Sequence, residues 1–258
     1  MFSLKKEYNE LEGKPIGFFV GGVYDKKVLY AYKGRKNYEL FAEIDISKHE
    51  HGKIKPIHNV DGNDVVYFCG SSGSGKTTMA AEYILSFLKQ HPKWKVYIIS
   101  RIPYKEDPAL SHLKMIQLDI DEPIDFVEEE YEDCLFFFDD VLNLTDKAKR
   151  DNVEKLIIDL LENARKSNVS VFLTSHIINP QNKMARIVLN EVKSLVVFPE
   201  SASSHQLKYA LNKYFNMSNQ KIKKVIDSDS RYVVVSRTCP NYCLEEQKAY
   251  MANDQDCK

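Results

Sequence analysis

The chain lacks the features that would send it into a membrane or along a secretory route. Its longest apolar runs are about five residues, as in Cys134–Phe138, whereas a bilayer-spanning helix needs roughly 18. The opening residues, MFSLKKEYNE, hold no apolar signal-peptide core. The cysteines number five, an odd count, and two lie in apolar strand-like runs. We therefore expect a protein with reduced thiols in a cytoplasm-like compartment.

A strong overall charge is also missing. The 258 residues carry a formal net charge of −1, with 28% charged and 43% hydrophobic residues. A protein that coats nucleic acid is usually far more basic, so any DNA contact must come from a local patch. The composition is globular, and the length allows one large domain or a large and a small one.

Local patterns divide the chain into three expected parts. Residues 1–60 read as a β-rich element, and the sequence leaves open whether its strands stand apart or extend the main sheet. Residues 61–240 read as the main domain, followed by a C-terminal tail over residues 241–258. The short β-branched and aromatic runs of the first part are Ile16–Val20, Val28–Tyr32 and Glu39–Ile46.

In the main domain, apolar strands alternate with helices. The strands are continuously apolar, which indicates burial on both faces of a parallel sheet, and their alternation with helices predicts a three-layer α/β fold. In the helix expected over residues 147–166, the apolar positions recur on one side. The other expected elements are a helix over Thr77–Lys89 and strands over Val65–Cys69, Val96–Ser100, Leu135–Phe138, Val169–Thr174, Leu195–Phe198 and Tyr232–Val235.

A phosphate-binding loop lies between the first of these strands and the first helix. The pattern G-x-x-x-x-G-K-[ST] fits in full, and its place between strand and helix is the one that the mechanism requires. Lys76 is expected on the β- and γ-phosphates of ATP and Thr77 on Mg²⁺. The nucleotide-binding residues are expected to be Gly70, Ser71, Ser72, Gly73, Ser74, Gly75, Lys76, Thr77 and Thr78.

A second motif ends the apolar run Cys134–Phe138, where Asp139 and Asp140 follow directly. Ligand sites of α/β folds lie at the carboxyl ends of strands, so this pair reads as a Walker B motif. We expect Asp139 to bind Mg²⁺ and Asp140 to orient or deprotonate the attacking water. Residues 121–140 contain ten acids and no base, so an exposed acidic turn is the competing interpretation.

The strand expected over Val169–Thr174 ends in further polar residues. Ser175 and His176, with Thr174 as another possibility, are candidates for a sensor of the γ-phosphate, and His176 is the one we assign a catalytic role. Arg165, at the end of the preceding helix, is a candidate arginine finger acting on a neighbouring subunit, and Arg186 is the second candidate. A cation favoured by the helix dipole is the alternative for Arg165.

Together with the Walker motifs, four C-terminal segments resemble the poxvirus-type genome-packaging ATPases of nucleocytoplasmic large DNA viruses, within the FtsK–HerA superfamily of P-loop ATPases. The resemblance covers roughly residues 60–240. The segments are Leu161–Arg165 running into Val171–His176, Ala185–Glu191, Leu195–Pro199 with Ser201–Ser204, and Ser230–Val234.

The resemblance implies a RecA/ASCE-like P-loop NTPase fold with a mainly parallel sheet. It implies a homo-oligomeric ring, pentamer or hexamer, that hydrolyses ATP with Mg²⁺ to move double-stranded DNA into a capsid. It further implies a capsid or portal-vertex partner and a location in the host cytoplasm or viral factory, or on the virion. Many superfamily members carry glutamine where this chain has His176, which leaves the sensor's identity open.

Charge distribution is compatible with DNA. Residues 181–224 contain eight lysines or arginines and two acids, and a moderate patch suits a motor that must release DNA at each step. A solvated helix face is the alternative interpretation.

Three other functions compete with the motor. A nucleotide kinase would need arginines on a lid, and no arginine-rich lid is evident. A GTPase would need N-K-x-D, which is absent. An ATP-binding scaffold protein of a viral assembly would not need Asp140.

Overall fold

The structure is a computed structural model that describes most of the chain. The described residues are 1–8, 11–33, 40–48, 52–57, 63–122, 124–126, 131–163, 166–176, 178, 182–201 and 203–253. Contacts divide the chain into two compact units, one of Asp61–Val192 and one that joins Met1–Val60 to Lys193–Lys258. Within the described part, none of the helices has the length and apolarity that crossing a bilayer requires.

The unit Asp61–Val192 is built on five parallel strands in the order β10-β9-β11-β12-β8. This confirms the α/β fold with parallel strands that the apolar runs predicted. The strands are β8 (Val65–Cys69), β9 (Lys95–Ser100), β10 (Ile116–Gln117), β11 (Cys134–Asp139) and β12 (Ser170–Ser175), and the helices are α1 (Lys76–Gln90), η1 (Tyr104–Glu106), α2 (Lys147–Asn163) and α3 (Lys183–Glu191).

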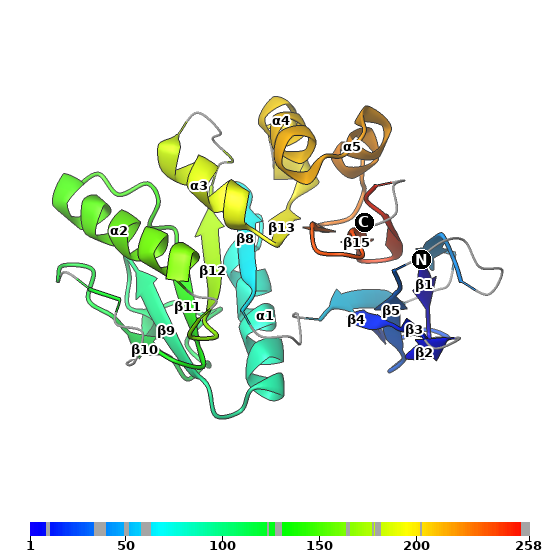
Figure 1. Cartoon of the computed structure of the whole chain (residues 1–258), viewed down its shortest axis with the longest axis horizontal. Helices are drawn as coiled ribbons and strands as arrows, with labels where there is room; N and C mark the ends of the chain where they lie inside the picture. The colour runs from blue at the N-terminus through cyan, green and yellow to red at the C-terminus, as the bar shows by residue number, and fades with distance from the viewer. Residues whose placement is uncertain are drawn as a thin grey trace. The chain divides into compact units, whose positions relative to one another are not determined.

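Helices cover both faces of this sheet. The chain runs from β8 through α1 to β9 in one direction across the sheet and from β11 through α2 to β12 in the other. Because parallel crossovers are right-handed, the two helices lie on opposite faces, and α3 packs against α2 (Figure 1). The helix α2 buries four positions of its expected apolar stripe, Val153, Leu156, Ile157 and Leu160. Leu161 is half-buried, and Ala164, the last expected position, lies outside the described residues. Because β8, β12 and β11 are parallel neighbours, their carboxyl ends lie together at the same end of the sheet.

The other unit is mostly antiparallel. One set of strands runs in the order β13-β14-β15-β16-β6, a second sheet has the order β1-β5-β4-β7, and β2 pairs with β3. Its elements are β1 (Phe2–Ser3), β2 (Glu7–Tyr8), β3 (Leu11–Glu12), β4 (Lys14–Val20), β5 (Val28–Ala31), β6 (Glu43–Asp45), β7 (Lys53–Pro56), β13 (Ser194–Val197), η2 (Pro199–Ser201), α4 (Ser204–Phe215), α5 (Asn219–Ile226), β14 (Val233–Ser236), β15 (Tyr242–Glu245) and β16 (Lys248–Met251).

This division differs from the one expected from local patterns, which joined residues 61–240 in one domain. The apolar strands β13 and β14 are buried as expected, but they pair antiparallel to each other. A continuous apolar run reports burial on both faces and does not report strand direction. Residues 242–251, placed in a tail, form the buried hairpin of β15 and β16. Of the first 60 residues, β6 pairs with β16, so the element is not separate from later strands.

Candidate active site

The loop between β8 and α1 is shaped by two glycines with positive φ. Gly73 has φ 78° and Gly75 has φ 96°, a region that side-chain-bearing residues rarely adopt. A Cβ on Gly73 would meet nothing within 4 Å, so the space above the loop is open. Gly75 is the N-cap of α1 and no side chain caps that end. The first N–H groups of the helix therefore remain for an anion, with the positive end of the helix dipole behind them.

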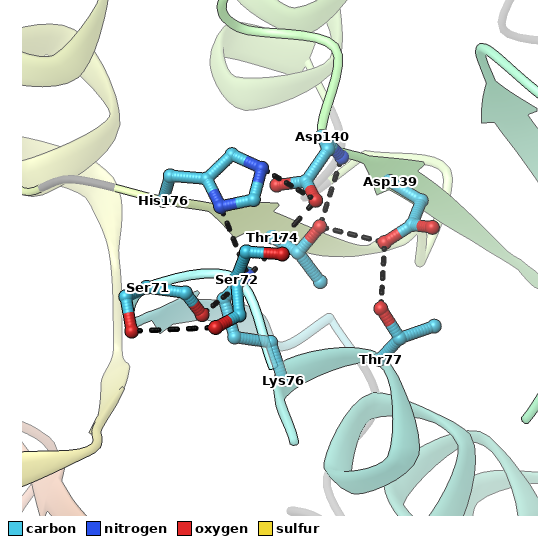
Figure 2. A network of polar contacts seen from close by, with 8 residues as sticks. All are labelled: Ser71, Ser72, Lys76, Thr77, Asp139, Asp140, Thr174 and His176. Atoms are coloured by element: carbon cyan, nitrogen blue, oxygen red, sulfur yellow. Dashed lines mark hydrogen bonds and ion pairs between the residues drawn. The ribbon is translucent and has the colours of Figure 1, made fainter. Parts of the chain in front are cut away.

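Lys76 is held at the centre of this loop by three acceptors. The residue is only 4% exposed. Its Nζ lies 3.2 Å from the Ser71 carbonyl oxygen, 3.4 Å from His176 Nδ1 and 4.0 Å from Asp140 Oδ2 (Figure 2). Burying an ammonium group costs free energy unless it is paired, so the surrounding acceptors hold its charge at the loop. The geometry brings together the residues expected from the P-loop, the acidic strand end and the third strand.

The carboxylate of Asp139 receives two hydroxyl groups on one oxygen. Its Oδ1 accepts a hydrogen bond from Thr174 Oγ1 at 2.7 Å and a longer one from Thr77 Oγ1 at 3.4 Å (Figure 2). Burial raises the pKa of Asp139 to about 6, and the nearby charges of Asp140 and Asp107 raise it too, against the Thr174 hydrogen bond and Lys76. A buried carboxylate that is costly to ionise and lies beside a threonine hydroxyl is suited to a cation.

Asp140 differs from Asp139 in its backbone conformation and in the contacts of its carboxylate. Its φ of 52° is left-handed, a strained conformation for a non-glycine residue. Its N–H donates to Thr174 Oγ1 at 2.9 Å, and its Oδ2 lies 3.2 Å from His176 Nε2. Its other oxygen, Oδ1, is buried and has no hydrogen-bond partner among the described residues. An unsatisfied buried acceptor of this kind is rare and fits a missing water or ligand.

Thr174 is the residue that sequence reasoning undervalued, since it was considered only as a possible sensor. It is fully buried and bridges Asp139 and Asp140 with one hydroxyl. The available signal was a threonine directly after the apolar run Val171–Leu173. Its partners could not be inferred from the sequence, because they depend on β12 lying beside β11.

A hollow of about 500 Å³ opens over these groups. Ser74 Oγ, in the loop beneath it, is buried and without a partner in the described part of the chain. The open space at Gly73 and the uncapped end of α1 fit a nucleotide's phosphates. The hollow is lined by Ser72, Gly73, Gly75, Lys76, Thr77, Thr78, Asp107, Pro108, Ala109, Asp140 and His176.

The donor set also fits Mg²⁺. The described residues contain no group of three or more His, Cys, Asp or Glu placed to hold a metal by themselves. Mg²⁺ bound with nucleotides usually needs only one or two carboxylates, because phosphates and waters complete its shell. Thr77 and Asp139 would supply the protein oxygens.

Of the remaining predicted residues, Gly70 lies at the site and Arg186 does not. Gly70 donates its N–H to the Ser175 carbonyl at 3.1 Å, which fastens the start of the loop to β12. Arg165 lies outside the described residues. Arg186 is exposed on α3 and does not line the hollow. Arg186 is therefore not brought to the site within the part of the chain that the structure describes, and the prediction for Arg165 lies outside that part.

Comparison with known proteins shows the family of the chain. Residues 53–197 match the family described as Novel STAND NTPase 3. The chain belongs to this NTPase family. It is also 32% identical over 245 residues to the uncharacterized protein V3 of the Sputnik virophage, a match that covers 92% of this chain and 95% of that protein.

Solved structures share the fold at low identity. The genome packaging NTPase B204 from Sulfolobus turreted icosahedral virus 2, in complex with ATP-gammaS, has a TM-score of 0.50 at 14% identity, covering 74% of this chain and 100% of B204. The pCW3 conjugation coupling protein TcpA has a TM-score of 0.50 at 12% identity, covering 93% and 78% of the two chains. EssC ATPases 2 and 3 from Geobacillus thermodenitrificans reach 0.52 at 16% identity, covering 84% and 45%. The resemblance to packaging ATPases is thereby confirmed at the level of the fold.

Proposed function

We propose that this NTPase hydrolyses ATP with Mg²⁺ and uses the energy to move double-stranded viral DNA into a capsid. The observation that carries the hydrolytic part is the division of labour between two adjacent acids. Asp139 lies with Thr77 on the metal side, whereas Asp140 presents a buried oxygen that has no partner among the described residues. Binding ATP without turnover would not need that second, strained carboxylate.

Each side chain then has a separate task. Lys76 binds the β- and γ-phosphates, and the N–H groups of the loop and of α1 surround them. Thr77 and Asp139 would hold Mg²⁺, which would supply positive charge beside the phosphates. Asp140, which lines the hollow, accepts a hydrogen bond from the attacking water and orients it. His176, between Lys76 and Asp140, is placed to respond to the γ-phosphate.

The DNA part of the proposal is supported by relatives and by a basic surface. B204 is described as a genome packaging NTPase, and V3 comes from a virophage. Between residues 201 and 226 the chain has five lysines and no acid. These residues form α4 and α5, which pack against each other (Figure 1). Lys208, Lys213 and Lys223 are exposed, whereas Lys224 is paired with Glu43 at 2.7 Å.

Assembly completes the proposal. A homo-oligomeric ring would surround the DNA and dock on a capsid or portal-vertex protein. In such a ring Arg165, or Arg186 on the exposed face of α3, would reach the nucleotide of the neighbouring subunit.

The test is ATP hydrolysis with and without long double-stranded DNA, at about 50 and 200 mM salt, with Lys76→Ala as the blank. We expect DNA to stimulate turnover and salt to remove the stimulation, because DNA binding releases counterions. The double variant Lys208→Gln/Lys213→Gln should weaken DNA binding and lower its salt slope by about 0.9 per lost phosphate contact. The matched control Lys89→Gln/Lys93→Gln removes two exposed lysines from the other unit and should leave both unchanged.

An ATP hydrolysis rate that DNA does not change at either salt concentration would contradict the proposal of DNA translocation. It would leave the proposal of ATP hydrolysis standing. Phosphate transfer to a nucleotide acceptor would instead select a kinase.

A further inference from the structure

Part of the lining of the hollow comes from a segment that belongs to neither the phosphate loop nor the acidic strand end. Asp107, Pro108 and Ala109 line the same space as Gly73 and Thr77. They follow β9, whose last residue Ser100 is the register partner of Asp139 on β11. The pairing of β9 with β11 therefore starts this segment beside Asp139, at the carboxyl end of β11.

Packing fixes this segment in place. Tyr104 is buried, its hydroxyl donates to the Met115 carbonyl at 2.9 Å, and its N–H donates to Gln117 Oε1 at 3.1 Å. Leu110 and Leu113, which follow in the chain, are also buried. Asp107 thus lies on a segment that is anchored on both sides of it.

The carboxylate of Asp107 is oriented by its own turn. Its Oδ1 accepts the Ala109 N–H at 2.7 Å, and its carbonyl accepts from Leu110 at 3.0 Å and Ser111 at 2.8 Å. The described residues offer this carboxylate no ion pair. Asp107 lines the same hollow as Thr77, whose hydroxyl donates to Asp139 Oδ1 at 3.4 Å.

We propose that Asp107 holds a water molecule of the Mg²⁺ hydration shell in the nucleotide pocket, which it lines together with Thr77. This inference rests on the proposed function of the site. Mg²⁺ keeps several waters when it is bound through one or two carboxylates and phosphates, and outer carboxylates orient such waters. Asp107 is half-buried, as a group that acts through water should be. It is a positioning residue, and Thr77 and Asp139 remain the protein ligands.

The decisive variant is Asp107→Asn, because asparagine keeps an oxygen for the Ala109 N–H and removes only the charge. The neighbouring Glu106→Gln is the matched control, since Glu106 is exposed and does not line the hollow. Two quantities are measured on the full chain. One is the affinity for a fluorescent non-hydrolysable ATP analogue in excess EDTA. The other is the Mn²⁺ affinity of the protein–analogue complex, from electron paramagnetic resonance titration.

We expect Asp107→Asn to lower Mn²⁺ affinity by about 10–100-fold, with metal-free analogue affinity within about twofold of wild type. Glu106→Gln should change neither quantity by more than about twofold. Unchanged Mn²⁺ affinity in Asp107→Asn, or an equal loss in both variants, would overturn the role of Asp107 and leave the ATPase proposal standing. A wild-type chain that binds no analogue would instead overturn the proposed function itself.

Discussion

Replacing Thr174 by valine isolates the hydroxyl group that connects the two acids. Valine has nearly the same shape, so the packing of β12 is kept while two hydrogen bonds are lost. The bond to the Asp139 carboxylate is of the charge-assisted kind that contributes about 1.5–3 kcal/mol, and an N–H left unpaired at Asp140 costs about 1–3 kcal/mol. Because Asp140 is partly accessible to water, we expect a loss of about 2–4 kcal/mol in the free energy of unfolding, measured by urea titration.

Thr174→Val should also raise the Mg²⁺ concentration that ATP hydrolysis requires, and the increase should be larger at lower pH. The Thr174 hydrogen bond lowers the pKa of Asp139, which burial sets at about 6. Without that bond the pKa rises further, and Mg²⁺ must displace a proton near neutral pH. Each unit by which this pKa exceeds the assay pH weakens metal binding about tenfold. The Mg²⁺ concentration for half-maximal ATP hydrolysis should therefore rise strongly at pH 6.5 and little at pH 8.5.

Thr174→Ser is the control, since serine keeps the hydroxyl and removes a methyl group that contributes about 0.8 kcal/mol. It should retain the wild-type Mg²⁺ requirement at both pH values. A valine variant with wild-type stability and an unchanged Mg²⁺ curve, or a serine variant as impaired as valine, would refute the reasoning.

Three further changes test the site. Asp139→Asn should raise stability at pH 7 by on the order of 2–3 kcal/mol in the metal-free protein, while abolishing hydrolysis. In the wild type, the raised pKa of Asp139 means that stability from this group grows as pH falls through about 6 towards 4; urea titrations from pH 4 to 8 should show that growth disappear in Asp139→Asn. His176→Ala should slow turnover more than it weakens ATP binding; equal losses in single-turnover and binding assays would contradict a sensor. Arg165→Ala mixed with Asp140→Asn should recover activity if the two act across one interface, and a mixture as inactive as either variant alone would remove support for an arginine acting in trans.

The parts of the site that sequence predicted are those set by neighbours in the chain. The turn at Gly73 and Gly75 follows from glycine's access to positive φ, and Lys76 and Thr77 must then begin the helix. The apolar run before Asp139 indicates a buried strand. Asp139 and Asp140 follow that run directly and are therefore expected at the carboxyl end of the strand. These positions needed no knowledge of distant contacts.

The parts that sequence did not predict depend on which segments lie side by side. The role of Thr174 requires β12 to pair with β11, and Asp107 reaches the hollow only because the segment after β9 is packed down through Tyr104. Continuous apolar runs could not reveal that β13 and β14 are antiparallel. The hairpin of β15 and β16 was mistaken for a tail because its strands are short and closely follow Cys239 and Pro240.

The most direct test of the central claim compares ATP binding and ATP turnover in Asp140→Asn. Asparagine preserves the backbone, and an amide oxygen can still face the hollow, but it cannot take a proton from water. The account predicts ATP affinity within about threefold of wild type, by equilibrium binding of a fluorescent analogue with Mg²⁺, and turnover reduced by at least about 100-fold, in the range usual for loss of a general base. Parallel losses in binding and turnover, or a variant that still hydrolyses ATP at the wild-type rate, would contradict the assignment of Asp140 to the attacking water.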